Sequence, residues 1–358
     1  MNNVKYWATF SQLGLGYRTV KQLLTALGSL EAIWQADRQQ LLAAGASAAL
    51  ADKLEVGRQR LRSGQYHERV DGRFEIVSIE DSRYPTLLRE IHSPPLVLYV
   101  RGDLTALANR CLTVVGTRIP SPYGLRATHT ITQPIAAEGV TIVSGLAFGI
   151  DAAAHQAALA AKGTTVAVLG SGVDLITPFG NADLGRRILE ASGTIISEYP
   201  PGTKPERHHF PQRNRIIAGL SRATVIVEAG VKSGALLTAR FALEENRDLF
   251  AVPGPIDAPT SAGPNNLLKL GASPVTGADD LREVLGLDRH APLPNTIELR
   301  ADNAAEATLL RLLAEPRHID ELVAISTLET SVVNATLSLL EMKGRVRHLG
   351  GMNYTRVS

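Results

Sequence analysis

Two arginines and an asparagine stand side by side in the segment FPQRNRIIAGLS, residues 210–221, as Arg213, Asn214 and Arg215. An apolar run follows at once, so these side chains begin a buried element. A guanidinium group donates parallel hydrogen bonds that match phosphate oxygens. The segment therefore predicts a phosphate-binding site. Further basic residues crowd the same stretch, although such a run could also be a solvated loop face: Lys204, Arg207, His208, His209 and Arg222.

The two arginines could instead hold the structure together. Glu198 and Glu228 each lie at or just after a predicted strand end, and a buried carboxylate needs a charged partner. We therefore expect these carboxylates to pair with Arg213 or Arg215 rather than to act in catalysis. Which arginine contacts a ligand stays open at this point.

Asp151 and His155 lie four residues apart at a predicted helix start, where they share a face. Such a pair could bind a metal or transfer protons. We expect a structural role instead, in which Asp151 complements the free amide groups of the helix and His155 makes an internal hydrogen bond. No further histidine, cysteine or carboxylate lies close in sequence. We therefore predict no catalytic residue, no metal site and no cofactor.

Glycine-rich turns follow several of the predicted strands. The carboxyl ends of parallel strands meet at one edge of a sheet, where helix N-termini present free amide groups to anions. Each turn alone could serve only to reverse the chain, but several on one edge suggest a long anion such as a run of phosphates. The residues are Gly116 and Arg118 in VVGTR, Ser144, Gly145 and Gly149 in VSGLAFGID, Gly170 and Gly172 in VLGSGVD, and Ser233 and Gly234 in VKSGALLTA.

Aromatic residues are scarce, yet several fall in predicted loops near the same edge. Exposed rings there could stack on the bases of a single strand, and the alternative for each is core packing. The residues are Tyr123, Phe148, Phe179, Tyr199 and Phe210.

Composition and length limit the class of protein. A chain of 358 residues favours two or three domains, and 44% hydrophobic with 20% charged residues is typical of a globular protein. The single cysteine, Cys111, lies in an apolar run, which excludes an internal disulfide and a thiolate zinc site. No apolar run reaches membrane-spanning length and no signal peptide is recognisable, so we predict a cytoplasmic protein without membrane insertion.

The chain reads as three parts. Residues 1–70 show short amphipathic helices with Leu-Gly turns, as in small SAM or helix-hairpin-helix modules. In residues 71–287, strands that are apolar on both faces alternate with helix-length segments, which predicts an α/β fold with an extended Rossmann-like, doubly wound, mostly parallel sheet. A proline-containing linker, 288–303, precedes residues 304–358. There, three helices and two strands around a Gly-Gly turn indicate a winged-helix-like domain.

The winged-helix-like domain has few cations where DNA would bind. Its expected recognition helix, residues 329–343, carries one lysine, and phosphate binding depends on cations. The pattern favours protein contacts over DNA binding there.

Taken in order, the motifs VVGTR, SGLAFGIDAAAH, LGSGVD, SEYPPG, FPQRNRIIAGLS, VEAGVKSGALLTARFA, AVPGPID and NNLLKLGA resemble the DNA-processing protein A (DprA/Smf) family over residues 84–285. The resemblance implies a non-enzymatic protein that binds single-stranded DNA without sequence preference. It also implies a homodimer that loads the RecA recombinase onto DNA during natural transformation. By motif, the DNA contacts would be Gly116, Arg118, Ser144, Gly145, Gly149, Gly170, Gly172, Arg213, Asn214, Arg215, Ser233 and Gly234.

Two positions depart from the family. Pro264 precedes Asn265 where other members usually have a small polar residue, and we attach no function to it. Many members carry Tyr-Pro with a nearby basic residue where this chain has Thr177, Pro178 and Phe179, and Arg186 or Arg187 could supply the charge from the following helix. A nucleotide-processing hydrolase with a Rossmann-like fold is the alternative function. The sequence gives it little support, because GSGVDL lacks the third glycine of GxGxxG and no GxxxxGK[ST] motif occurs.

Overall fold

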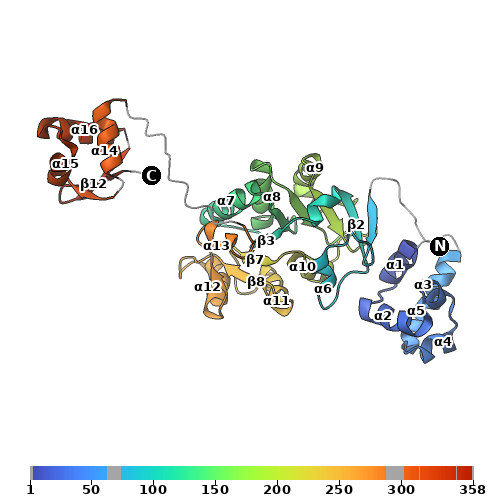
Figure 1. Ribbon diagram of the computed structural model, residues 1–358. Helices are drawn as coiled ribbons and strands as arrows, with labels where there is room; N and C mark the ends of the chain where they lie inside the picture. The colour runs from blue at the N-terminus through green and yellow to red at the C-terminus, as the bar shows by residue number, and fades with distance from the viewer. Residues whose placement is uncertain (1–2, 63–73, 288–301, 314, 344, 357–358) are drawn as a thin grey trace. The chain divides into compact units, whose positions relative to one another are not determined.

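The computed structural model describes residues 3–62, 74–287, 302–313, 315–343 and 345–356. It divides into two compact units, Met1–Asp288 and Arg289–Ser358, and each is described by itself (Figure 1). The predicted linker, 288–303, lies almost entirely outside the described residues, and so does the boundary predicted near residue 70. The domain limits therefore stay a prediction.

A nine-stranded sheet forms the centre of the larger unit, in the order β1-β2-β6-β5-β4-β3-β7-β8-β9. The strands from β6 to β9 in this order are all parallel, and β1 and β2 add an antiparallel edge. The predicted Rossmann-like, mostly parallel sheet is confirmed. The strands are β1 (Glu75–Ser78), β2 (Val97–Gly102), β3 (Cys111–Val115), β4 (Thr141–Ser144), β5 (Thr165–Val168), β6 (Thr194–Ser197), β7 (Ala223–Ile226), β8 (Asp248–Ala251) and β9 (Ser273–Pro274).

Both faces of the sheet are buried in hydrophobic clusters. Successive strand residues point to opposite faces, so one strand contributes to both clusters. On β3, Leu112 and Val114 belong to one hydrophobic cluster, and Cys111 and Val115 to the other. Figure 1 shows α7, α8 and α9 on one side of the sheet and α10, α11 and α12 on the other. The helices are α6 (Thr86–Glu90), α7 (Pro122–Ala137), α8 (Ile150–Ala160), α9 (Ala182–Glu190), α10 (His209–Gly219), α11 (Ala235–Glu244), α12 (Ala262–Lys269) and α13 (Asp279–Arg282).

The direction of the strand order reverses at β3. The chain passes from β3 outward through β4, β5 and β6, and then returns through α10 to β7, which pairs with the free side of β3. At such a reversal, the connections that follow the two neighbouring strands leave toward opposite faces of the sheet. A crevice therefore remains between them at the carboxyl ends of the two strands. The fold therefore places a ligand-sized opening beside β3 and β7.

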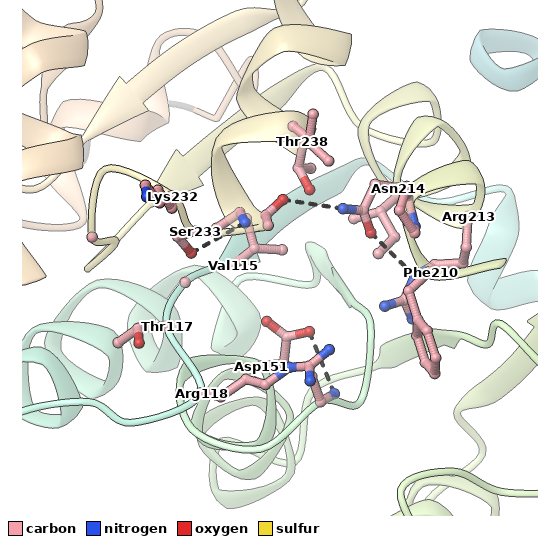
Figure 2. Close-up of a pocket in the computed structure, with 18 of the residues that line it drawn as sticks. Val115, Thr117, Arg118, Asp151, Phe210, Arg213, Asn214, Lys232, Ser233 and Thr238 are labelled. Atoms are coloured by element: carbon pink, nitrogen blue, oxygen red, sulfur yellow. Dashed lines mark hydrogen bonds between the residues drawn. The ribbon is translucent and has the colours of Figure 1, made fainter. Parts of the chain in front are cut away.

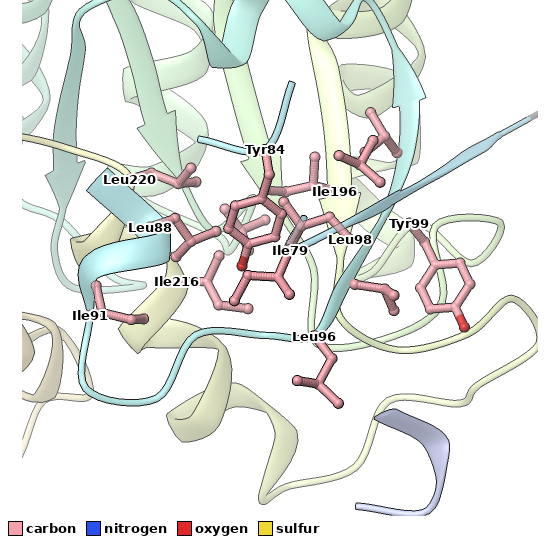
Figure 3. Close-up of a cluster of buried hydrophobic side chains, with 14 of the residues drawn as sticks. Ile79, Tyr84, Leu88, Ile91, Leu96, Leu98, Tyr99, Ile196, Ile216 and Leu220 are labelled. Carbon is pink, nitrogen blue, oxygen red and sulfur yellow. The ribbon is translucent and has the colours of Figure 1, made fainter. Parts of the chain in front are cut away.

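The antiparallel edge is held by a compact apolar cluster (Figure 3). Tyr84 is fully buried, and its hydroxyl donates to the Pro95 carbonyl at 2.8 Å. Its ring lies among side chains from α6 and α10, including Leu88 and Ile216. The edge strands are thus packed against the same helix α10 that reaches the crevice.

Five short helices precede the sheet in the described part of the chain, and the first of them, α1, packs on the β1 edge. Trp7 donates to Glu80 at 3.2 Å, and Gln12 donates to the Tyr99 hydroxyl at 3.1 Å. Both bonds join α1 to the edge of the sheet. The helices are α1 (Asn3–Gln12), α2 (Tyr17–Leu27), α3 (Leu30–Gln35), α4 (Arg38–Ala43) and α5 (Ala48–Arg62).

The smaller unit is the predicted winged helix. Its elements are α14 (Ala304–Leu312), β10 (Arg317–His318), α15 (Ile319–Ser326), α16 (Thr330–Met342), β11 (Val346–Gly350) and β12 (Asn353–Arg356). The short strand β10, which the sequence pattern did not indicate, pairs with β12. Within the described part of the chain, no single helix is long and apolar enough to cross a membrane, although α15 and α16, bent by 119°, meet that length and composition together.

His155 is buried in α8 and makes the expected internal hydrogen bond. Its Nδ1 lies 2.7 Å from the Thr165 hydroxyl, which itself donates to the Ile142 carbonyl at 2.7 Å. Nδ1 must therefore carry the proton, and the buried Nε2 has no hydrogen-bond partner. Burial, helped by the nearby positive charge of Arg213, lowers the pKa of His155 to about 3.

This histidine makes the stability of the protein depend on pH. The unfolded chain takes up a proton near pH 6.5, whereas the folded chain resists protonation down to about pH 3. The contribution of His155 to the free energy of unfolding is therefore present above about pH 6.5 and is lost as the pH falls below it. The loss between pH 7 and pH 5 is about 2 kcal/mol. We expect His155→Gln to lose less stability over this interval than the wild type, as measured by urea unfolding.

His129, an exposed residue of α7, provides the control. His129→Gln should keep the wild-type loss between pH 7 and pH 5. Equal losses in His155→Gln and the wild type would contradict the assignment.

Candidate nucleic-acid interface

A cleft of about 660 Å³ opens at the carboxyl ends of β3 and β7 (Figure 2). The loop after β3, the first turns of α10 and the start of α11 form its walls. It therefore lies at the reversal of the strand order, where open α/β sheets bind their ligands.

Arg213 forms the buried floor of this cleft. Its Nη1 donates to the Gly145 carbonyl at 2.7 Å and also to the Val168 carbonyl, and its Nε donates to Asn214 at 3.3 Å. Burial lowers the pKa of Arg213 to about 10, against the opposing effect of Asp151, so the group stays charged at neutral pH. Arg213 thus joins the ends of β4 and β5 to α10.

Asp151 balances this buried cation. Its Oδ2 accepts from the backbone amide groups of Gly145 at 3.1 Å and Ala147 at 3.4 Å. These amide groups belong to the loop before α8 and not, as expected, to the helix itself. Burial raises the pKa of Asp151, and the charge of Arg213 acts in the opposite direction. The carboxylate is therefore occupied within the protein.

Glycine is required at position 145 by the close approach of the Arg213 guanidinium. A Cβ atom there would lie 2.6 to 2.7 Å from three guanidinium atoms. Such distances are far inside van der Waals contact, so a side chain would displace Arg213. The turn after β4 thus serves the cleft by making room for the arginine.

Asn214 orients the opposite wall. Its Nδ2 donates to the Gly234 carbonyl at 3.2 Å, immediately before α11. Ser233 and Gly234 line the cleft. They also accept from the amide groups of the first turn of α11: Ala235 donates to the Ser233 hydroxyl at 3.3 Å, Leu236 to the Ser233 carbonyl at 3.1 Å, and Leu237 to the Gly234 carbonyl at 3.1 Å. The start of α11 is therefore held in place beside the cleft.

Three exposed cations surround the opening: Arg118 after β3, Arg207 before α10, and Lys232 before α11. Among the described residues, none of the three pairs with a carboxylate. The Arg118 guanidinium lies 5.9 Å from the centre of the Phe210 ring. With Arg213 as a fourth cation and Asp151 as the acid of the lining, the cleft carries an excess of positive charge.

Arg215 points away from the cleft. It forms a largely buried ion pair with Glu198, which confirms the structural role considered for one arginine of the pair. Glu228 behaves differently: its carboxylate accepts from the Ser121 amide and hydroxyl at 2.8 and 2.6 Å, and from the Thr260 hydroxyl at 3.0 Å. The expectation that Glu228 pairs with an arginine is therefore wrong, because the start of α7 supplies it with neutral donors.

The structure brings half of the predicted contact residues to the cleft lining and leaves the rest outside it. Ser144 donates its hydroxyl to the Val114 carbonyl at 2.7 Å and so bridges two strands. The Gly170 carbonyl accepts from Nδ1 of His209, the residue before Phe210, at 3.0 Å. The lining residues are Gly116, Arg118, Arg213, Asn214, Ser233 and Gly234, and the others are Ser144, Gly145, Gly149, Gly170, Gly172 and Arg215.

Lys232 and Thr117 line the cleft although the sequence motifs did not predict them as contacts. A signal for Lys232 exists in the sequence, because it directly precedes the Ser-Gly pair that begins α11. Thr117 lies between two predicted residues, Gly116 and Arg118, so its position in the same turn is a comparable signal.

One group among the described residues brings potential metal ligands together. Glu206, His208 and His209 each offer one ligand atom, and these atoms lie within 4.8 Å of one another. The first two are exposed, whereas His209 is buried and bonded to the Gly170 carbonyl. The expectation of no metal site stays a prediction.

Two protein-family models and a known relative match nearly the whole chain. The family model described as DNA recombination-mediator protein A matches residues 75–286, and a DprA winged helix domain model matches residues 292–352. The Smf protein of Synechocystis is 38% identical over 98% of both chains. The Smf protein of Escherichia coli is 44% identical over 60% of this chain and 58% of its own.

Two solved structures resemble the fold. DNA processing protein A from Streptococcus pneumoniae has a TM-score of 0.67 at 34% identity and covers 79% of this chain and 98% of its own. The same protein from Helicobacter pylori, whose structure concerns a single-stranded DNA binding mode, has a TM-score of 0.53 at 32% identity. It covers 59% of this chain and 96% of its own.

The contact between Gly145 and Arg213 can be tested by adding a single methyl group. Gly145→Ala should lower the free energy of unfolding by about 1–3 kcal/mol, because the new Cβ overlaps the buried guanidinium. Gly277→Ala is a matched control, since nothing lies within 4 Å of a Cβ at that position. Urea unfolding of both variants measures the difference, and equal stabilities would refute the close contact.

Proposed function

The chain belongs to the DprA/Smf family of DNA-processing proteins, and we propose that it binds single-stranded DNA without sequence preference through the cleft beside β3 and β7. The observation that carries the proposal is the set of exposed cations Arg118, Arg207 and Lys232 around the opening, none of which pairs with a carboxylate among the residues that the structure describes. Guanidinium, ammonium and backbone amide groups all bind phosphate oxygens. Such contacts hold a nucleic-acid backbone and carry no sequence information.

The aromatic ring of the cleft favours a single strand. Phe210 lines the cleft beneath Arg118 and beside Arg213. Every nucleobase has a flat face that stacks on such a ring, but only an unpaired strand presents that face. The related protein from Helicobacter pylori, which has a single-stranded DNA binding mode, supports the same assignment.

We further propose that the protein acts as a recombination mediator and loads RecA onto the bound strand during natural transformation. The matching family model is described as a recombination mediator, which supports this role. In this proposal the protein holds the DNA and performs no reaction. The carboxylates considered for a hydrolase are engaged within the protein: Glu198 pairs with Arg215, and Glu228 accepts from Ser121 and Thr260.

A homodimer is part of the proposal. Large apolar side chains late in the sheet unit are exposed, among them Leu243, Ile256 and Leu270. Isolated exposed apolar residues are common, but burying several in a self-complementary contact would stabilise a dimer. We propose that these side chains contribute to it.

Salt dependence tests the cleft directly. Each cation that neutralises a phosphate releases about one counterion, so Arg118→Ala and Lys232→Ala should each weaken binding to oligothymidylate. Each should also reduce the slope of log affinity against log salt concentration by about 1. Fluorescence anisotropy over a range of salt concentrations measures both quantities.

Arg222 is the matched control, because it is exposed and precedes β7 at the opposite end of that strand. Arg222→Ala should keep the wild-type slope. An unchanged slope in both cleft variants, or a wild-type preference for duplex DNA, would refute the assignment.

The mediator role predicts a coupled loss. The double variant Arg118→Ala, Lys232→Ala should stimulate RecA filament formation on strands coated with single-strand-binding protein less than the wild type does, because it holds the strand less tightly. The loss should shrink when the variant is supplied at a concentration that restores DNA occupancy. No stimulation by the wild-type protein would refute the mediator role and leave DNA binding intact.

A further inference from the structure

Two phenylalanines are exposed beside the cleft, on the loops that follow β4 and β5. Phe148 is 48% exposed, and Phe179 is 89% exposed. A ring as open to water as that of Phe179 contributes little to the core, so burial within this unit does not explain it. Neither residue lines the cleft.

The two loops are fastened to each other. Asn181 donates through Nδ2 to the Leu146 carbonyl at 2.8 Å and to the Ala147 carbonyl at 3.1 Å. The Phe148 ring packs on the backbone of Gly180, the neighbour of Phe179, because a Cβ at Gly180 would lie 3.0 Å from Phe148 Cε1. The two loops that carry the exposed rings are therefore joined to each other.

The joined loops adjoin the cleft. Gly149 has a φ of 77° and packs so closely on the loop after β3 that a Cβ there would lie 2.3 Å from the Thr117 carbonyl oxygen and 2.7 Å from the Arg118 carbonyl carbon. Because β3, β4 and β5 are neighbours in the sheet, Arg118, Phe148 and Phe179 follow one another along its carboxyl edge.

Two carboxylates flank Phe179 in sequence, Asp174 and Asp183. Asp174 accepts from the Gly202 amide at 2.9 Å, and Asp183 pairs with Arg186. The carboxylates that flank Phe179 in sequence are thus occupied.

We propose that Phe148 and Phe179 form a stacking platform for the bases of a single strand that leaves the cationic cleft, an inference that rests on the proposed function. The cleft holds phosphates at Arg118, and the platform receives the bases of the nucleotides that follow. Base stacking on an aromatic ring is independent of sequence and requires bases that are not stacked in a duplex. The platform therefore adds affinity for a single strand over a double strand.

Oligonucleotides with and without bases test the platform. Phe179→Ala should weaken binding to an oligothymidylate of about 16 nucleotides by about tenfold, because one stacked base is lost. It should leave the salt slope unchanged, because no charge is removed. Binding of an abasic strand of the same length should be unaffected, and Phe179→Trp should restore the affinity for oligothymidylate.

Leu125→Ala, which removes an exposed apolar side chain from α7, is the matched control and should bind like the wild type. The exposure of Phe179 makes its replacement compatible with folding, and urea unfolding checks this. An equal loss on the abasic strand, or no loss on oligothymidylate, would overturn the platform. Loss of RecA stimulation with unchanged DNA affinity would overturn it too, by marking a protein contact. Absence of wild-type binding to oligothymidylate would instead refute the proposed function.

Discussion

The buried guanidinium of Arg213 is the interaction on which the cleft depends. It joins the carbonyl groups at the ends of two strands to α10, and Asp151 offsets its charge from the first turn of α8. A buried cation is tolerated only when its donors are matched in this way. Because Arg213 fixes the ends of β4 and β5, the loops that carry Phe148 and Phe179 leave the sheet in defined directions.

The cations of the site fall into two groups with different tasks. Inside the protein, Arg213 bonds to carbonyl groups and Arg215 pairs with Glu198. Arg118 and Lys232 stand at loop positions where, among the described residues, no carboxylate pairs with them. Internal pairing keeps the walls rigid, and the unpaired groups stay available to a ligand, so stability and binding draw on different residues.

The sequence predicts the sheet well because strands buried on both faces, such as β4 and β5, leave an unambiguous apolar pattern. It could not decide where individual side chains point. Arg213 and Arg215 lie two residues apart on α10, so their side chains emerge on different faces of the helix and cannot both line the cleft. Ser144 lies outside the cleft lining for a similar reason, since its hydroxyl is used by the neighbouring strand.

Pairing of β3 with β7 also has a consequence for how the chain acquires its binding surface. The Thr113 hydroxyl donates to the Ile217 carbonyl and lies 2.8 Å from the Ser221 hydroxyl, and these partners are 104 and 108 positions later in the chain. Closing a loop of this length is a slow, entropically costly step. A nascent chain that has not yet been synthesised as far as β7 contains most of the glycine turns but lacks a wall of the cleft. In the proposed function, affinity for nucleic acid is therefore gained late, when the sheet is complete.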